Sequence, residues 1–581
     1  MKRHAALALC LGIAACQSPN TQGEADIESE ELGEAQQAVE TLTDPSEENS
    51  IRFLEQATFG PRLQWAAATP PTDSVEQVVD VGITASITAL FSGTNTPFDG
   101  TSASQSLDAQ FFVQAIDHPD QLRQRVAFAL SQIVVVSLNG LPTGTTGSCV
   151  GTPAECQPKE AMADYLNYLK THSLGNYKNL LSAVTKSPAM GRYLDMVNNR
   201  AFDTAGAPIE PNENFARELL QLFSLGTHML NDDGTYKLSG GNRIPAYTED
   251  HVKAFARALS GWTYAKVGGT GDLALDCPTV GKSNTLNYTQ DMIGCAINHD
   301  SSSQTLLTVD HDNNSTTPEQ PEVTTAGGTP LQHLNQSINN IFKHSNVPPF
   351  ICKQLIQHLV TSNPTPAYVG RVVAKFKNNG SGVRGDMKTV IRAILEDNEA
   401  RGATPIPSQL SSYGHLRSPV LHVTNLVRWL DGHMDLTGGK NPGAKLAAAT
   451  VAMSQSVTRP PSVFSFYPPT APLPGQAPLL GPEFAIFNAA TSTTRANVTY
   501  DMLFTAGYTN AGVTLNVGVL PTTPDDLVTW LARYPLHGSA SSDLQVKIYE
   551  TITDPWATNT LRKQRMAMML AALSPEFSIQ R

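Results

Sequence analysis

The feature that most limits the fold of this chain is a helical spacing of apolar residues that recurs along most of its length. In residues 122–133 the apolar positions return every three or four residues and form one stripe of an amphipathic helix. The same spacing occurs at 164–171, 177–185, 215–225, 251–262, 334–344, 350–361, 368–378, 387–397, 419–430 and 562–573. We therefore expect a mainly α protein, with a multi-helix body and long irregular loops.

Strand signals, by contrast, are few. The clearest lies at 227–238, where Asn231-Asp232-Asp233-Gly234 is a turn sequence between short apolar pairs. This pattern predicts a hairpin beside the helices.

Changes in composition suggest how the chain is organised. We expect a helical body over 51–400, which contains a polar insertion at 268–330, and a second helical part over 413–581. A Pro/Ser-rich joint at 402–412 separates them. A further irregular stretch, 458–482, is rich in proline and aromatic residues.

Residues 1–16 have the form of an export signal. Lys2-Arg3 precedes an apolar run at 5–15 that is too short to span a bilayer. The run ends in Ile13-Ala14-Ala15-Cys16, which looks like a bacterial lipobox, so Cys16 is predicted to carry a lipid. An ordinary signal peptide cut after Ala15 is the alternative.

An acidic segment follows this leader. Residues 17–50 hold ten Asp or Glu residues, no Lys or Arg and no aromatic residue, so they are expected to form a disordered tether. Gln17, rather than Asp, follows Cys16 and favours the outer membrane of a Gram-negative cell envelope. No later apolar run could span a bilayer, so the membrane is expected to hold the chain through the lipid anchor alone.

The formal net charge is −12, and most of it lies in the predicted tether. The remaining body is nearly neutral, which argues against nucleic acid as a partner. Of the seven cysteines, Cys10 leaves with the leader. In an oxidising compartment we expect the pairs Cys149–Cys156 and Cys277–Cys295, with Cys352 as a buried small hydrophobic residue.

The most polar helix is predicted at 210–226, in a chain with no H-E-x-x-H, G-x-S-x-G, S-x-x-K or G-x-G-x-x-G motif. Glu213, Arg217 and Gln221 share one face of it, and Glu218 lies beside them. It is either a capped surface helix or a catalytic helix on which Arg217 orients carboxylates. The catalytic candidates are Glu213, Arg217, Glu218 and the upstream Asp195. Because its flanks are apolar, we predict that Arg217 is buried in a polar cluster.

Metal ligation is the other chemistry that the sequence suggests. Asp195 with Asn198 and Asn199 offers oxygen ligands for a hard cation, and a nearby His would suit zinc or iron. The pairs His299-Asp300 and His311-Asp312 lie in polar loops. His299 and Asp300 are therefore candidate ligands of a divalent metal, with solvated loop residues as the alternative.

Several segments together resemble one known bacterial family. They are RFLEQATFGP (52–61), QRVAFALSQIVVVS (124–137), GNYKNLLSAVTKSPAMGRYLDMVNN (175–199), PNENFARELLQLFSLG (211–226), AYTEDHVKAFARALSGWT (246–263), YGHLRSP (413–419), PSVFSFY (461–467), GPEF (481–484) and SPEFSIQR (574–581). In this order they resemble the family called domain of unknown function 1800, over essentially 51–581.

The resemblance implies a mainly helical exported protein, often encoded beside a second family with a sulfatase-like fold, and it implies no reaction. The chain departs from the family at Asn212, where Asp is usual, and near Gln304, where a Lys is usual. Asn212 replaces either an acidic site residue or only a helix cap.

Two classes of function follow. The first is a surface-anchored accessory or binding factor that acts with an exported partner, with the aromatic, Pro-rich residues 464–474 as a contact surface. The second is a hydrolase or metal-dependent enzyme that uses a cluster of Glu, Asp, Arg and His. An enzyme should bring Asp195, Glu213, Arg217 and His299 into one pocket.

Overall fold

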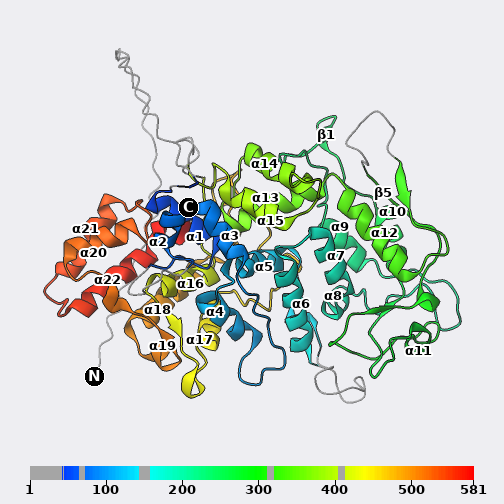
Figure 1. The fold of residues 1–581 in the computed structure, drawn as a ribbon, viewed down its shortest axis with the longest axis horizontal. Helices are drawn as coiled ribbons and strands as arrows, with labels where there is room; N and C mark the ends of the chain where they lie inside the picture. Colours follow the sequence, from blue (N-terminus) through cyan, green and yellow to red (C-terminus); the bar gives the residue numbers. More distant parts are fainter. Residues whose placement is uncertain (1–41, 44, 64–71, 143–156, 310–319, 403–411) are drawn as a thin grey trace, which may run out of the picture. The chain divides into compact units, whose positions relative to one another are not determined.

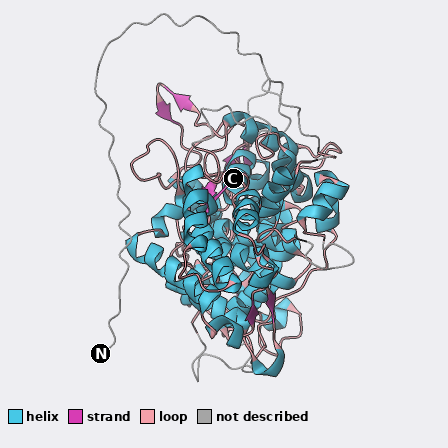
Figure 2. Ribbon diagram, turned by 90° about the vertical axis from the view of Figure 1, so that its left-hand side faces the viewer, coloured by secondary structure: helices cyan, strands magenta, loops and turns pink. Residues whose placement is uncertain are grey.

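Helices form where apolar stripes meet local capping signals. The computed structural model describes residues 42–43, 45–63, 72–142, 157–309, 320–402 and 412–581. Helices dominate these residues, and the strands are few and short (Figures 1 and 2). The predicted mainly α class is confirmed.

The helices have the following bounds in the described residues: α1 (Glu47–Ala57), α2 (Val75–Val81), α3 (Ile83–Phe91), α4 (Leu107–Asp117), α5 (Gln121–Ile133), α6 (Pro158–His172), α7 (Tyr177–Lys186), α8 (Pro188–Tyr193), α9 (Asn214–Gln221), α10 (Glu249–Ala258), α11 (Leu273–Asp276), α12 (Pro330–Lys343), α13 (Val347–Leu359), α14 (Pro366–Lys377), α15 (Met387–Glu396), α16 (Pro419–Trp429), α17 (Pro442–Ala452), α18 (Ala489–Phe504), α19 (Gly507–Asn510), α20 (Pro524–Arg533), α21 (Ser542–Thr553), α22 (Thr560–Leu573) and α23 (Pro575–Ser578).

The strands form antiparallel pairs. These are β1 (Leu238–Ser239) with β2 (Asn242–Arg243), β3 (Trp262–Thr263) with β4 (Ile293–Gly294), β5 (Thr305–Thr308) with β6 (Pro321–Val323), β7 (His415–Leu416) with β10 (Ile579–Gln580), and β8 (His433–Met434) with β9 (Val513–Thr514).

The predicted turn at 231–234 forms. The backbone N–H of Gly234 donates to the carbonyl of Asn231 at 2.9 Å, and Leu230 lies opposite Tyr236 in an antiparallel bridge. The chain then continues into β1 and turns again into β2. The hairpin of the sequence prediction is thus the first half of a three-segment meander over 227–246.

The segment predicted as a tether is shorter than expected at its C-terminal end. α1 begins at Glu47, inside the predicted range 17–50, because the Ser46 side chain accepts the backbone N–H of Asn49. Asn49 and Ser50 are already buried. Residues 1–41, with the predicted lipidation site Cys16, lie outside the described part. Among the described helices, none is both long and apolar enough to cross a bilayer.

The helix α5 lies at the centre of the packing. From residue 40 onward the chain forms one compact unit, in which α5 contacts α4, α6 and α13 (Figure 1). Its stripe residues Val126, Ala129 and Leu130 are fully buried, as the periodicity predicts. Helices α16 and α17, which follow the predicted joint at 402–412, pack against α4. The C-terminal part therefore shares its core with the N-terminal part.

A buried arginine attaches α16 to the N-terminal loop. The Arg428 side chain donates to the carbonyls of Gly60 and Ile116, at 2.5 and 2.7 Å, and also pairs with Asp73. Gly60 has a φ of +131°, and a Cβ there would lie 2.9 Å from the Cα of Asn425. Only glycine fits this close approach of the loop to α16.

Burial of His344 makes the stability of this fold depend on pH. Desolvation, with the nearby cations Lys237 and Arg384 and the side chain of His251, lowers the pKa of His344 to about 4. Its Nδ1 accepts the backbone N–H of Asn346 at 3.1 Å, which requires the neutral ring. Between about pH 6.5 and pH 4 the unfolded chain binds a proton that the folded chain does not.

We therefore predict that the free energy of unfolding decreases by about 1.4 kcal/mol per pH unit, through His344 alone, as the pH falls through this window. His344→Asn keeps an acceptor for Asn346 and cannot protonate, so its pH dependence should be shallower by that amount. Urea unfolding between pH 7.5 and 4.5 measures both slopes. Equal slopes would contradict the assignment.

Candidate functional site

The polar helix α9 forms an exposed ion-pair cluster. Arg217 donates to Glu213 at 2.9 Å and to both carboxylate oxygens of Glu249, at 3.0 and 2.6 Å. The Arg217 side chain is 37% exposed and that of Glu249 54%. The prediction that Arg217 is buried is wrong, because α9 buries only the face with Phe215, Leu219 and Leu220, and its other face is turned to solvent.

Asn212 acts at the start of this helix. Its side chain accepts the backbone N–H of Asn214 at 2.8 Å. Its own backbone N–H donates to the Asn199 carboxamide oxygen, and its carbonyl accepts from the Asn199 amide nitrogen. The replacement of the family's Asp by Asn is therefore compatible with a capping role.

Glu218 differs from its neighbours. Burial raises the pKa of its carboxyl above the ordinary value, against the opposing charge of Arg217. Its Oε2 is buried and has no hydrogen-bond partner among the described residues. The environment of Glu218 thus favours the protonated carboxyl.

The predicted oxygen ligands around Asp195 are separated by their hydrogen bonds. The nearest cation to Asp195 is Arg192, at 3.9 Å, and the Asp195 side chain is half exposed. Asn198 accepts from the Thr263 hydroxyl at 2.6 Å, while Asn199 binds the backbone of Asn212. Each of these side chains therefore makes a separate local contact, with Arg192, Thr263 or Asn212.

His299 and Asp300 are also engaged. His299 Nδ1 lies 2.9 Å from the Ser260 carbonyl and its Nε2 lies 2.9 Å from Nδ1 of His333, and both rings are buried. Asp300 accepts from Arg257 at 3.2 Å and from Ser302. The described residues contain no cluster of three or more His, Cys, Asp or Glu that could hold a metal. His311 and Asp312 lie outside the described part.

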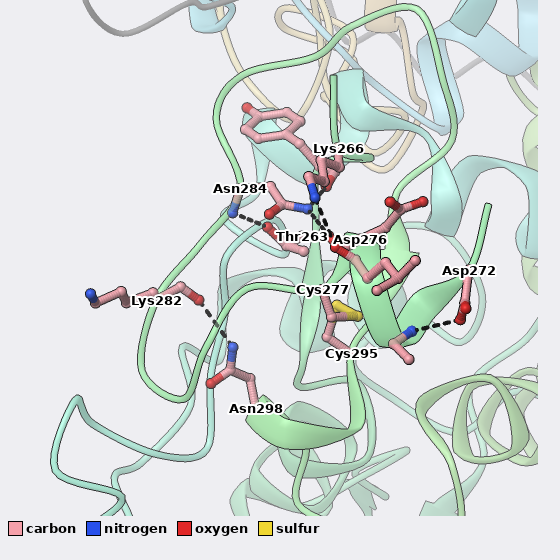
Figure 3. The surroundings of a disulfide bond; sticks show 12 residues. Thr263, Lys266, Asp272, Asp276, Cys277, Lys282, Asn284, Cys295 and Asn298 are labelled. Atoms are coloured by element: carbon pink, nitrogen blue, oxygen red, sulfur yellow. Dashed lines mark hydrogen bonds between the residues drawn. A yellow bond between two sulfur atoms is a disulfide. The ribbon is translucent and has the colours of Figure 1, made fainter. Parts of the chain in front are cut away.

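One predicted disulfide is present. Cys277 and Cys295 are bonded, with their Cα atoms 5.6 Å apart, and they join the end of α11 to the loop after β4 (Figure 3). Asn284, in the loop between them, donates its backbone N–H to the Thr263 hydroxyl at 3.0 Å and its side-chain amide to the Asp276 carbonyl at 2.9 Å. Cys352 is free and buried, and burial raises the pKa of its thiol. The proposed pair Cys149–Cys156 lies outside the described residues.

A groove with a volume of about 280 Å³ lies on the described surface. One face of α13 forms its base, with Phe350, Lys353, Gln354 and Gln357 at i, i+3, i+4 and i+7. The meander forms one wall. The Pro-rich segment forms the other, with Val463, Phe464, Pro468, Pro469, Thr470 and Leu480. None of Asp195, Glu213, Arg217, Glu218 and His299 lines this groove.

Side-chain bonds hold the Pro-rich wall in place. Gln357 donates to the carbonyl of Pro469 at 3.2 Å, and Asn363 makes two hydrogen bonds, of 2.9 and 2.8 Å, to the backbone of Leu480. On the opposite side, Gly226 has a φ of +74°, and a Cβ there would lie 2.7 Å from the ring of Phe350. Glycine is therefore required where the meander begins.

The groove is lined by one ammonium, that of Lys353, one imidazole, that of His228, and otherwise by side chains without a charge. Its polar side chains are mainly carboxamides and hydroxyls, and it has no carboxylate in its lining. Phe464 and Tyr236 are 45% and 40% exposed. Lys353 makes one long hydrogen bond, 3.5 Å, to the Gly234 carbonyl, and burial lowers the pKa of its ammonium. Such a mixture of aromatic faces and few polar groups is typical of a ligand site.

Sequence reasoning identified only part of this groove. The contact segment 464–474 was predicted, and its first residues do line the groove. The sequence predicts α13 as an amphipathic helix and does not predict the groove. Lys353, Gln354 and Gln357 occur at the spacing usual for core residues, and such polar residues signal a helix face that is not packed against the core. Segments that carry the family resemblance meet here, with Gln132 from 124–137, Gln221 and Gly226 from 211–226, and Phe464 from 461–467.

The described residues thus form a multi-helix fold with a groove over α13. The sequence matches the family described as "Protein of unknown function (DUF1800)" over residues 52–579, so the chain belongs to that family. Searches of curated proteins and of solved structures found no match.

Two arginines with contrasting burial provide a test of the helix α9. Arg217→Ala should lower the free energy of unfolding by less than about 1 kcal/mol, because exposed pairs are screened by water. Arg417→Ala should lower it by about 3–5 kcal/mol, because Arg417 and its partner Glu55 are both fully buried. Urea unfolding measures both values. A larger loss for Arg217 than for Arg417 would contradict the burial that the structure gives them.

Proposed function

We propose that this protein is a lipid-anchored accessory or binding factor of the bacterial cell envelope, which holds a ligand in the groove over α13 and acts with an exported partner. The leader with Cys16, the tether and Gln17 support an anchor in the outer membrane. The family resemblance makes an exported protein with a sulfatase-like fold the candidate partner.

The groove is the observation that carries the binding function. It combines about 280 Å³ of space with exposed aromatic rings on the meander and the Pro-rich segment and with carboxamides on α5, α9 and α13. The carboxylates expected for hydrolysis lie elsewhere, in ion pairs such as Arg217–Glu213 and Arg257–Asp300. The groove lining holds Lys353 and the imidazole of His228 but no carboxylate, so the carboxylates expected of a hydrolase do not lie in it.

A hydrolase or metal-dependent enzyme is the second candidate, and Glu218 is the observation that favours it. A buried carboxyl with a raised pKa is suited to donate a proton. If this function holds, Glu218→Gln should abolish turnover while leaving binding in the groove unchanged. If the protein only binds a ligand, Glu218→Gln should leave that binding unchanged.

The anchor is tested by fractionation of cells. Cys16→Ser should release the protein from the membrane into the soluble fraction, because the lipid would be the only attachment. Ala15→Gly, which keeps a small residue before the cysteine, is the control and should stay in the membrane. Membrane retention of the Cys16→Ser variant would contradict the lipoprotein assignment.

The groove is tested by filling it. Gln354→Trp places an indole on the base of the groove, and Lys375→Trp places one on the exposed face of α14 as a matched control. We expect envelope saccharides or peptides that bind in the groove to raise the melting temperature of the wild type and the Lys375 variant, and not that of the Gln354 variant. Equal protection of all three, or no protection of the wild type by any member of the set, would contradict the proposal.

A further inference from the structure

The groove has one charge and many groups that both donate and accept hydrogen bonds. Gln354 uses its amide nitrogen on the Phe350 carbonyl at 3.2 Å, which leaves its oxygen without a protein partner among the described residues. The Oε1 of Gln132 is buried and likewise has no partner among them. Carboxamides left in this state are complementary to hydroxyl groups, which can supply the missing donors.

Lys353 adds a charge that the protein does not neutralise. Within the described residues it has no carboxylate at ion-pair distance; the nearby Asp233 instead accepts from the backbone and hydroxyl of Thr235, at 2.9 and 2.6 Å. An ammonium that is partly buried and makes one long bond to a carbonyl gains most from an anionic ligand group. One such cation suits a ligand with isolated rather than contiguous negative charges.

Aromatic faces complete the site. Phe464 on the Pro-rich wall and Tyr236 on the meander are exposed and lie among the lining residues with Phe350. A pure hydrocarbon ligand would leave the carboxamides desolvated without partners, which is unfavourable. A peptide that adds as a strand would need a free strand edge, but Met229, Lys237 and Ile244 use their backbone N–H groups within the meander.

From these contacts we propose that the groove binds an acidic saccharide: sugar hydroxyls pair with the carboxamides, a ring lies against Phe464, and one carboxylate or sulfate ester pairs with Lys353. This assignment rests on the proposed binding function and names its ligand class.

The experiment is calorimetric titration of the full-length lipoprotein in detergent with oligogalacturonate, its methyl-esterified form, a sulfated carrageenan oligomer and a glutamate oligopeptide. We expect the wild type to bind at least one of the two charged saccharides, and which one it binds distinguishes carboxylate from sulfate. Lys353→Met should weaken that binding at least tenfold, as expected for loss of a charge-assisted hydrogen bond. Lys375→Met, an exposed lysine on α14, should bind as the wild type does.

A second pair of variants tests the aromatic contact. Phe464→Ala should weaken the same binding severalfold. Tyr500→Ala, which removes an exposed ring on α18 that does not line the groove, should not weaken it. Melting curves of each variant confirm that it folds.

Three outcomes would overturn the inference. If the methyl ester binds as well as the acid and Lys353→Met binds normally, charge recognition is refuted although binding in the groove survives. If only the glutamate peptide binds, the saccharide class is refuted. If none of the four probes binds the wild type, the acidic saccharide is refuted, while the Gln354→Trp screen decides separately whether the groove binds any ligand.

Discussion

The buried ion pair between Arg417 and Glu55 is the constraint on which the rest of the structure depends. Both side chains are fully buried, and the Arg417 guanidinium, with the neighbouring His537 side chain, holds the pKa of Glu55 below its ordinary value although burial alone would raise it. Arg417 also donates to the carbonyl of Phe577 in α23, and its own carbonyl accepts from Arg495 at 2.9 Å. Removing two charges from water is costly unless every partner is in place. The first helix, the last helix and the middle of the chain must therefore meet for this pair to be stable.

The same junction determines where the groove lies. Beside Arg417, the strand β7 pairs with the C-terminal strand β10, and Gln580 donates to the carbonyl of Leu359 at the end of α13. The carbonyl of Gly414 accepts from Ser362, whose own carbonyl accepts from Gln357 on the base of the groove. Hydrogen bonds thus connect the segment just before Arg417 to the base of the groove. Because Gln357 and Asn363 also hold the Pro-rich wall, the width of the groove is fixed by the core and not by a loose surface loop.

The local secondary structure could be predicted from the sequence, but the burial of charged side chains could not. Apolar spacing gives the helices, and Asn231-Asp232-Asp233-Gly234 gives the turn, because both depend on neighbours in sequence. Burial of an arginine depends on what covers it. Arg217 and Arg417 both stand beside apolar residues, yet Arg217 is exposed and Arg417 has a partner 362 residues away in sequence. The groove was missed for the same reason: the spacing of 350, 353, 354 and 357 predicts a shared face, while the absence of a covering helix is a property of the whole fold.

The location of polar groups separates the two functional classes. Acidic side chains that the sequence made candidates are neutralised on the surface by Arg217 and Arg257, where an ion pair in water has little capacity to perturb reactivity. The groove keeps its polar atoms unneutralised: one ammonium, carboxamide oxygens without partners, and no acid. The Oε1 of Gln132, which is buried without a hydrogen-bond partner among the described residues, would gain one from a complementary ligand. Glu218 is the exception on the other side, a buried carboxyl without a partner for one oxygen, and it lies one turn before Gln221, which lines the groove. If catalysis occurs in this protein, a ligand held over α13 and extending towards α9 is the arrangement that would bring a substrate to Glu218, whose pKa is raised by burial.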